Sequence, residues 1–579
     1  MRILFLHPQI RLDQPPLNPP YGILQLLAIT DELGYKVECL DNNAFRLPLD
    51  AIRQEINSPH QAAIDQVKGE IEQLYKKFSN IPLDDKNGLA TLQDEIQQRE
   101  KKIGAGLLRS DQSWDVIGIG GLITQYKYVK ELVPVCREKH PDAVIVGGGG
   151  FMTSMPREMM RWLPDLDIGV IGEAYNTWRD VLNHVDDENW KQVQGLIYRH
   201  GKNAKFSTMR PLIPEEELDE EIPWPAYEFS PVETYLMNSR IPYSPEAMSP
   251  NCRRLSVLTS YGCSMRCSFC FHNGSSPFCQ SQIYNKKVTG KPFRQHSPKY
   301  IVNLIQHLRQ TYCINFVSFL DENMTVNRKW FLEFCDLLAE SGLATLINWG
   351  MVVHSRTVDG DLLRKAKDCG CTYISFGGET SSERLLKKMG KGQTKEQMSA
   401  AIQATQAAGI NAIMSFIVGF PETTIDDLIG DLQFYIDNQI HVIPFFLQPY
   451  PGSKLYNEYK DKIIEQYLTD EEKLFLSDPT PMKLGLLESQ KSIKVDKLDE
   501  VTQSWIKKNF DTISYSLKDQ ALERWVSILD DAVQLTANLT KFDDVTLSGL
   551  RWLISTNMAD LTPKWQDMKR LEKFKNEHK

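Results

Sequence analysis

The sequence lacks any apolar stretch long enough to cross a bilayer, which excludes a helical integral membrane protein. It also lacks an excess of basic residues. The net charge is −9 and the pI is about 5.8, and this argues against a general nucleic-acid binder. Residues 1–8 reach a proline too soon for a secretory signal peptide, and we expect them to begin with a strand.

A disulfide framework is also missing. The 11 cysteines are odd in number and mostly scattered along the chain. Unpaired cysteines fit a reducing compartment, so we expect a cytoplasmic protein. The 579 residues suffice for three or four domains, and 42% hydrophobic and 24% charged residues are ordinary values for a globular chain.

Three cysteines form the most informative pattern that is present. Cys263, Cys267 and Cys270 have the spacing Cys-x3-Cys-x2-Cys, directly after an apolar run at 255–260. Three thiolates this close can hold three irons of a [4Fe–4S] cube and leave the fourth iron open for chemistry. A structural zinc site is the alternative, because Cys-x2-Cys also suits tetrahedral zinc, with His272 or Cys279 as a further ligand.

Strands and helices alternate on both sides of this motif. The apolar runs around the cysteines predict six strands, at 255–260, 315–320, 346–353, 373–376, 412–418 and 442–447. Repeated βα units of this size indicate a parallel, partial (β/α)6 barrel with its active groups at the carboxyl ends of the strands.

The N-terminal third repeats this alternation. Five nearly continuous apolar strands are predicted, at 2–6, 36–40, 115–120, 143–146 and 168–171. They indicate an α/β unit with a doubly wound, Rossmann-like parallel sheet, in which ligands bind at the carboxyl edge. No intact Gly-x-Gly-x-x-Gly opens the first helix, so the pattern does not favour an ordinary dinucleotide site.

Composition divides the chain further. A proline-rich acidic stretch reads as a linker, and Trp and Leu at helical spacing predict a mostly α-helical C-terminal region. The expected divisions are 1–205 for the N-terminal domain (with a helical insertion at 48–110), 206–251 for the linker, 252–455 for the barrel and 456–579 for the helical domain.

The cysteine run resembles the cluster loop of the radical S-adenosylmethionine (SAM) enzymes. The layout at 19–22, 147–150 and 168–173 is similar to the cobalamin-binding domain that precedes many of these barrels. The resemblance, to the cobalamin-dependent (class B) radical SAM family, covers about residues 1–455 and implies a [4Fe–4S] cluster, SAM and cobalamin as cofactors. The Asp-x-His-x-x-Gly signature of other cobalamin proteins is absent, which leaves the lower face of cobalt to water, another side chain or nothing.

The resemblance also implies residue roles. Cys263, Cys267 and Cys270 would bind the cluster and be catalytic. The contacts to SAM would be Phe269, Asp321, Glu322, Arg356, Gly377, Gly378, Glu379 and Gly419. The contacts to cobalamin would be Tyr21, Gly120, Gly121, Gly148, Gly149, Gly172 and Glu173. One departure stands out: Gly-Gly-Glu follows the fourth barrel strand here, whereas the family's motif of that composition belongs to the second.

The implied reaction is reductive cleavage of SAM to a 5′-deoxyadenosyl radical, followed by methylation of an unactivated carbon with methylcobalamin. A cobalamin-dependent cyclase or rearrangement enzyme without net methyl transfer is the alternative, and a cobalamin- or zinc-binding module is a non-enzyme reading. The substrate could be a small molecule, lipid, tetrapyrrole or peptide, and a flavodoxin or ferredoxin would donate electrons. A methylthiotransferase is disfavoured because no second cysteine trio occurs in the N-terminal domain.

Overall fold

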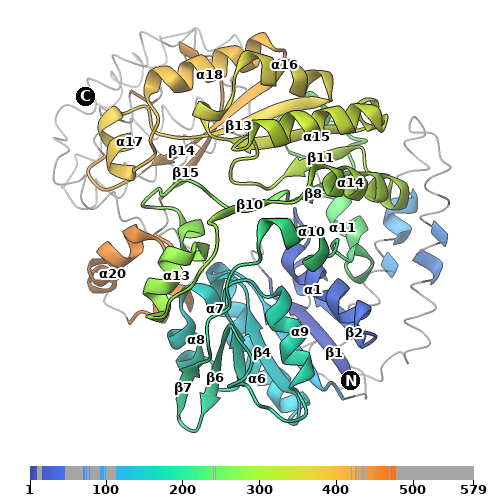
Figure 1. Cartoon of the computed structure of the whole chain (residues 1–579), viewed down its shortest axis with the longest axis vertical. Coiled ribbons are helices and arrows are strands. Elements are labelled where there is room, and N and C mark those ends of the chain that lie inside the picture. Colours follow the sequence, from blue (N-terminus) through green and yellow to red (C-terminus); the bar gives the residue numbers. More distant parts are fainter. Residues whose placement is uncertain are drawn as a thin grey trace, which may run out of the picture.

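The computed structural model describes residues 1–9, 16–45, short pieces of 69–99 and, with gaps at 239, 242 and several positions between 419 and 469, residues 113–476. Two large sheets organise this part of the chain, one in each half of the molecule, and their strands are mostly parallel (Figure 1). The α/β fold class predicted for both halves is confirmed. The predicted helical domain at 456–579 lies mostly outside the described residues, as does most of the insertion at 48–110.

The N-terminal sheet has seven strands in the order β2-β1-β3-β4-β5-β6-β7. The first five in this order are parallel, and β6 and β7 add an antiparallel edge. Their bounds are β1 Arg2–His7, β2 Lys36–Asp41, β3 Val116–Gly120, β4 Val144–Gly148, β5 Ile168–Val170, β6 Leu196–His200 and β7 Asn203–Phe206. The sequence did not predict β6 and β7, whose mixed polar residues give no apolar run.

Both faces of this sheet are covered, which explains its apolar strands. Alternate residues of β1 enter two separate cores, Phe5 on one face and Leu4 on the other. Helices α1 (Tyr21–Glu32) and α9 (Tyr175–Asn183) pack on the Phe5 face, where the ring of Trp178 lies 5.0 Å from that of Phe5. Helices α6 (Tyr126–Lys139) and α8 (Pro156–Trp162) cover the opposite face.

The second sheet contains the six predicted barrel strands, all parallel and adjacent in chain order, β8-β11-β12-β13-β14-β15. Their bounds are β8 Arg254–Val257, β11 Phe316–Phe319, β12 Asn348–Val353, β13 Cys371–Glu379, β14 Asn411–Val418 and β15 His441–Phe446. The edge strands β8 and β15 do not pair with each other, so the sheet is an open partial barrel, as predicted.

The barrel helices begin where side chains cap them. Ser297, Asn327, Asp359 and Thr394 each accept a hydrogen bond from a backbone amide three residues on. These caps start α14 (Pro298–Tyr312), α15 (Arg328–Glu340), α16 (Gly360–Asp368) and α18 (Lys395–Ala407). A further short helix, α17 (Glu383–Met389), follows β13 and ends at Gly390 in the left-handed conformation.

The predicted linker is a folded strap. It contains the short helices α10 (Leu218–Glu221), α11 (Val232–Met237) and α12 (Pro245–Met248), because Leu218, Ile222 and Tyr235 are fully buried and fix helical turns between the prolines. The composition predicted irregular structure and could not show this burial.

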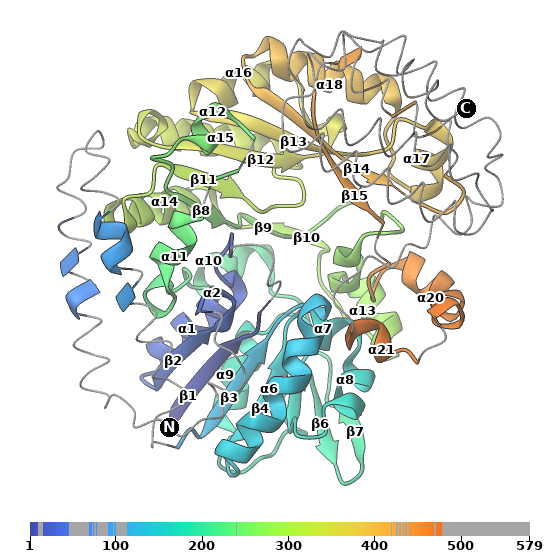
Figure 2. The same ribbon diagram turned by 180° about the vertical axis from the view of Figure 1, so that it is seen from behind.

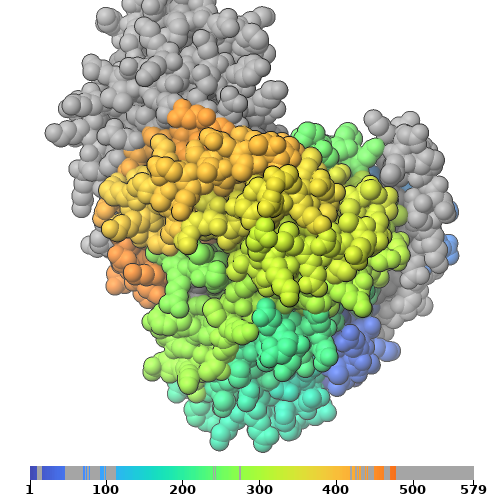
Figure 3. Space-filling view, turned by 45° about the horizontal axis from the view of Figure 1, so that its top comes forward, coloured from blue at the N-terminus to red at the C-terminus, as the bar shows by residue number. Residues whose placement is uncertain are grey.

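An antiparallel pair of short strands joins the two halves. Strands β9 (Ser260–Gly262) and β10 (Phe293–Gln295) pair antiparallel and lie between the two sheets in both ribbon views (Figure 2). Arg294 of β10 forms an ion pair with Glu173, just after β5, and the Tyr261 hydroxyl accepts a 3.1 Å hydrogen bond from the Gln25 amide of α1. In the space-filling view the barrel residues rest directly on the N-terminal half (Figure 3).

No described helix is both long and apolar enough to span a membrane.

Candidate active site

The cysteine loop begins at a position that only glycine can occupy. Gly262, the last residue of β9, has φ +82°, and a Cβ there would lie 1.9 Å from the Pro292 carbonyl oxygen. The loop is then fastened on both sides of Ser268: its amide donates to the Met389 carbonyl (2.8 Å), and its carbonyl accepts from the Leu455 amide (2.9 Å). The backbone between Cys267 and Cys270 is therefore held by the ends of two helices, α17 and α20 (Lys454–Tyr467).

The three predicted cluster ligands are free thiols in this loop, with Cys267 buried and Cys263 and Cys270 half-buried. Burial raises the pKa of all three thiols, to about 11 for Cys267 and about 12 for Cys270, where the Glu322 carboxylate adds to the effect. Metal binding at these positions must therefore release protons, as thiolate ligation requires.

A buried ion pair that the sequence did not predict lies beside the cysteines. The Lys391 ammonium is 2.7 Å from the Glu379 carboxylate, and both residues are less than a tenth exposed. Burial alone would lower the pKa of Lys391, but Glu379 and then Cys267 hold it above its ordinary value. The Lys391 charge in turn lowers the pKa of Cys263 and Cys267, opposing the effect of burial, so this cation favours the thiolate form that binds metal.

The chain around this pair is shaped to hold it. Glu379 has φ +67°, and the pairing of β13 with β14 shifts register between Gly377 and Glu379. A Cβ on Gly377 would approach the Lys391 nitrogen to 2.7 Å, so glycine leaves the room that the ammonium fills. The Lys391 carbonyl lies 3.0 Å from Nε2 of His354, which follows β12.

Of the predicted SAM contacts, several surround this centre. Glu322 pairs with His272 (2.7 Å), and Arg356 donates to the Gly392 carbonyl (2.7 Å), next to Lys391. Phe269 packs against the apolar cluster of Leu385, Met389, Phe420, Leu447, Leu455 and Tyr459. Gly378 lies against Met414, whose sulfur would be 2.4 Å from a Cβ there. Gly419 lies outside the described residues.

Asp321, a predicted SAM contact, is buried and hydrogen-bonded within the protein. It is 1% exposed and accepts hydrogen bonds from the Thr259 hydroxyl (2.6 Å), the Thr259 amide and the Ser260 hydroxyl. These bonds tie the end of β8 to the end of β11. Burial raises the pKa of Asp321 from 3.8 to about 6, although the hydrogen bonds oppose the shift.

This shift predicts a pH-dependent effect of Asp321→Asn. Because the folded pKa is raised, the Asp321 contribution to stability is fully present below pH 3.8 and is lost as pH rises through about 6. Asparagine does not titrate, so the free energy of unfolding of the variant relative to wild type should rise by about 2 kcal/mol between pH 4.5 and 8. Urea denaturation at several pH values measures this difference, and a flat difference would contradict the assignment.

The predicted cobalamin contacts gather at the carboxyl edge of the N-terminal sheet. Two of the glycines there allow close packing: a Cβ on Gly149 (φ +83°) would lie 2.7 Å from the Gly121 carbonyl oxygen, and one on Gly120 would lie 3.1 Å from the Ile23 side chain. Gly148 instead faces open space, and neighbouring Leu122 is 43% exposed. Gly148 and Leu122 thus form a small accessible shelf at this edge.

The other predicted cobalamin contacts already form interactions within the protein. The Glu173 carboxylate accepts from the Ile213 amide (3.0 Å) and pairs with Arg294, so it joins the two halves. Gly172 has φ +74°, a conformation that disfavours any residue with a side chain. Its amide donates a hydrogen bond to the Thr153 hydroxyl. Tyr21 begins α1, close to Tyr227, Tyr261 and Tyr300, whose hydroxyls raise its pKa in addition to burial.

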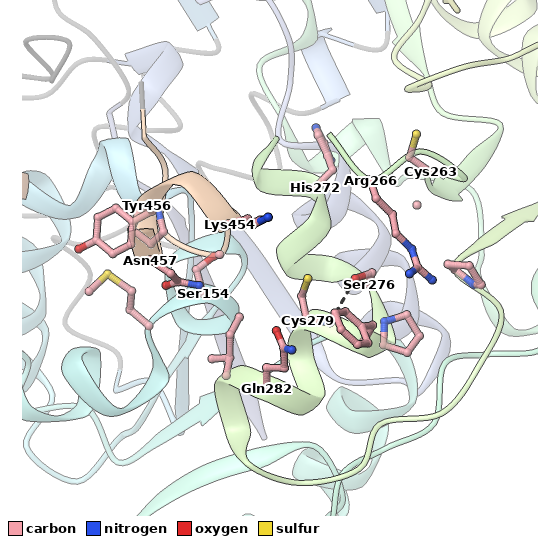
Figure 4. Close-up of a pocket in the computed structure, with 18 of the residues that line it drawn as sticks. Ser154, Cys263, Arg266, His272, Ser276, Cys279, Gln282, Lys454, Tyr456 and Asn457 are labelled. Atoms are coloured by element: carbon pink, nitrogen blue, oxygen red, sulfur yellow. Dashed lines mark hydrogen bonds between the residues drawn. The ribbon is translucent and has the colours of Figure 1, made fainter. Parts of the chain in front are cut away.

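A cleft of about 870 Å³ opens beside the cysteine loop (Figure 4). Its walls are the α7–α8 turn (α7 is Gly150–Ser154), the loop at 262–266, helix α13 (Pro277–Tyr284) and the start of α20. Cys263 lines it, whereas Asp321 and Glu379 do not. Among the described residues, no three His, Cys, Asp or Glu side chains converge on a single metal ion. A [4Fe–4S] cube does not need such convergence, because each thiolate binds a different iron.

Comparisons with known proteins agree with these features. Residues 257–435 match the radical SAM superfamily. The chain is 27% identical to an uncharacterized methyltransferase of Pyrococcus horikoshii, over 59% of this chain and 68% of that protein. It is 25% identical to the anaerobic magnesium-protoporphyrin IX monomethyl ester cyclase of Cereibacter sphaeroides, over 60% of this chain but only 54% of the cyclase.

A large part of the chain is also similar in fold to a solved structure. The radical SAM methyltransferase TsrM from Kitasatospora setae, solved with cobalamin and a [4Fe–4S] cluster, superposes with a TM-score of 0.55 over 80% of this chain and 78% of that one, at 15% identity. At this identity the likeness concerns the fold alone. The superfamily match therefore shows a radical SAM domain at residues 257–435, and the fold of the chain is similar to that of a cobalamin-dependent radical SAM enzyme.

Proposed function

We propose that this protein is a cobalamin-dependent radical SAM methyltransferase that modifies an unactivated carbon. The observation that carries the proposal is the loop of Cys263, Cys267 and Cys270, fastened by helix ends next to a buried cation. When bound, a [4Fe–4S] cluster on these thiolates would supply the electron that cleaves SAM, and cobalamin would supply the methyl group.

The chain's own residues would position the reactants. Glu322, Arg356 and the backbone at Gly377 lie around the cysteine loop and could hold the charged and ribose parts of SAM. The shelf of Gly148 and Leu122 belongs to the other half, and the Arg294–Glu173 pair holds the halves together. A cofactor on the shelf and a substrate between the halves would thus meet with little motion.

The relatives include both a methyltransferase and a cyclase, and the TsrM structure with a similar fold is that of a methyltransferase. The Pyrococcus horikoshii relative is named a methyltransferase, whereas the Cereibacter sphaeroides relative is a cyclase. The alternative function is accordingly a cobalamin-dependent cyclase or rearrangement enzyme. The proposed electron donor is a flavodoxin or ferredoxin. The proposed contacts to SAM and cobalamin are the residues that the family resemblance implies.

The test is anaerobic purification with cobalamin, followed by incubation with SAM and a chemical reductant. We expect about four irons and one cobalamin per chain, and reductant-dependent formation of 5′-deoxyadenosine. With methyl-deuterated SAM and an extract of small molecules as substrate source, a product heavier by a deuterated methyl group supports methyl transfer. A product that retains no label supports the cyclase alternative. Zinc without iron in the loop would refute both.

A further inference from the structure

The cleft beside the cysteine loop carries an uneven set of charges. Its basic lining residues are Arg157, Arg266, Lys454 and Lys460, and its acidic ones are Glu158 and Glu471. Only Lys460 has a carboxylate partner among them, Glu471 at 3.3 Å. A local excess of cations is notable because the chain as a whole carries a net charge of −9.

The other three cations have no carboxylate partner in the part of the chain that the structure describes. The Arg157 guanidinium stacks over the Phe206 ring at 4.4 Å, and that of Arg266 lies 5.5 Å from the Phe278 ring. Lys454, at the start of α20, extends toward α13 in Figure 4, where Cys279 faces the same space. Like charges around one cleft repel one another, and a bound anion would relieve that repulsion.

An apolar surface adjoins these cations. The Phe278 ring is 58% exposed, an unusual state for an aromatic side chain, and Met155, Met265 and Ile283 also line the cleft. Large exposed apolar side chains beside polar groups are a common property of ligand sites. A ligand that fits both surfaces has an apolar body and an anionic end.

We propose that this cleft binds an organic anion, a carboxylate or phosphate group attached to an apolar body, through Arg157, Arg266 and Lys454 with Phe278 as the apolar contact. Identification of this anion as the substrate rests on the proposed function, because the cleft adjoins Cys263. The anion binding itself does not, and it is tested without SAM cleavage.

Cys279 is a built-in probe of the cleft. Its thiolate displaces iodide from iodoacetate or iodoacetamide, so that a carbon–sulfur bond forms, iodide leaves and the thiol proton passes to buffer. In the cluster-loaded protein, peptide mapping gives the rate at Cys279 alone. We expect the iodoacetate-to-iodoacetamide rate ratio to exceed that of N-acetylcysteine amide at least about threefold, because cations attract the charged reagent.

Variants and competitors complete the test. The double variant Arg157→Gln/Lys454→Gln should bring the ratio close to that of the free thiol, while Lys287→Gln, an exposed lysine outside the cleft, should not change it. Phenyl phosphate should slow alkylation at lower concentration than inorganic phosphate at equal ionic strength, and Phe278→Ala should remove that advantage.

Each opposite result overturns a part of the proposal. A rate ratio at Cys279 equal to that of the free thiol refutes anion binding in the cleft. Equal protection by phenyl phosphate and inorganic phosphate in the wild type refutes the apolar contact and assigns the site to free phosphate. Since neither result depends on 5′-deoxyadenosine formation, failure here is distinct from failure of the proposed function.

Discussion

Replacing Cys267 with alanine should abolish 5′-deoxyadenosine formation from SAM, a loss of about a thousandfold or more in rate, or at least about 4 kcal/mol in the barrier. Cys267 is the most buried of the three thiols, and the Lys391 charge lowers its pKa against the effect of burial. Without it, two half-buried thiolates remain, which are too few to hold three corners of a cube. Iron content and 5′-deoxyadenosine measured by chromatography after anaerobic reconstitution report the loss.

The matched control is Cys313→Ala. Cys313 is a half-buried thiol that lies at the end of α14, away from the loop. This variant should keep its iron and its SAM cleavage. If Cys267→Ala kept both as well, the cluster would not be bound at this loop and the proposed function would fail.

Replacing Lys391 with methionine should destabilise the protein by about 3–5 kcal/mol, because the Glu379 carboxylate would remain buried without its cation. Urea denaturation in the absence of metal measures this change. The double variant Glu379→Gln/Lys391→Met removes both charges and should recover most of the loss. Lys388→Met is the control: its ion pair with Glu422 is largely exposed and should contribute less than about 1 kcal/mol.

The same substitution should also change the electron affinity of the bound cluster. Reduction adds a negative charge next to Lys391, and a buried cation stabilises the more negative state. In the double variant, whose stability we expect to be close to that of wild type, a changed reduction potential would report the environment of the cluster and not a loss of stability. Lys391→Arg should stay closest to wild type, and Lys391→Met should have a more negative reduction potential in a redox titration followed by paramagnetic resonance. An unchanged potential would limit Lys391 to a structural role.

Much of the fold follows from local patterns in the sequence. Helices α14 and α15 follow local signals of this kind, because Ser297 and Asn327 cap periodic apolar segments. The six barrel strands are apolar runs that need no partner to be recognised. Strands β6 and β7 were missed, because short segments with polar residues become strands only through pairing with their neighbours.

The site was less predictable because side-chain direction depends on distant contacts. Asp321 and Glu322 are neighbours, yet Asp321 turns to Thr259 and Glu322 pairs with His272. Lys391 meets Glu379 only after β13 and the turn beyond α17 are assembled. A local signal existed, since Lys391 stands between Gly390 and Gly392, both with positive φ, and two glycines so close together are typical of a backbone in the left-handed region.

The two backbone bonds at Ser268 bear on the order of assembly during synthesis. Met389 and Leu455, which form them, are made long after the cysteines have left the ribosome. Until α20 docks, the metal-binding turn lacks the hydrogen bond from Leu455, and we expect its thiols to be more accessible to oxidants or adventitious ions. Iron insertion is thus expected late, after most of the polypeptide has folded, and chains shortened before Leu455 should emerge unable to retain a cluster.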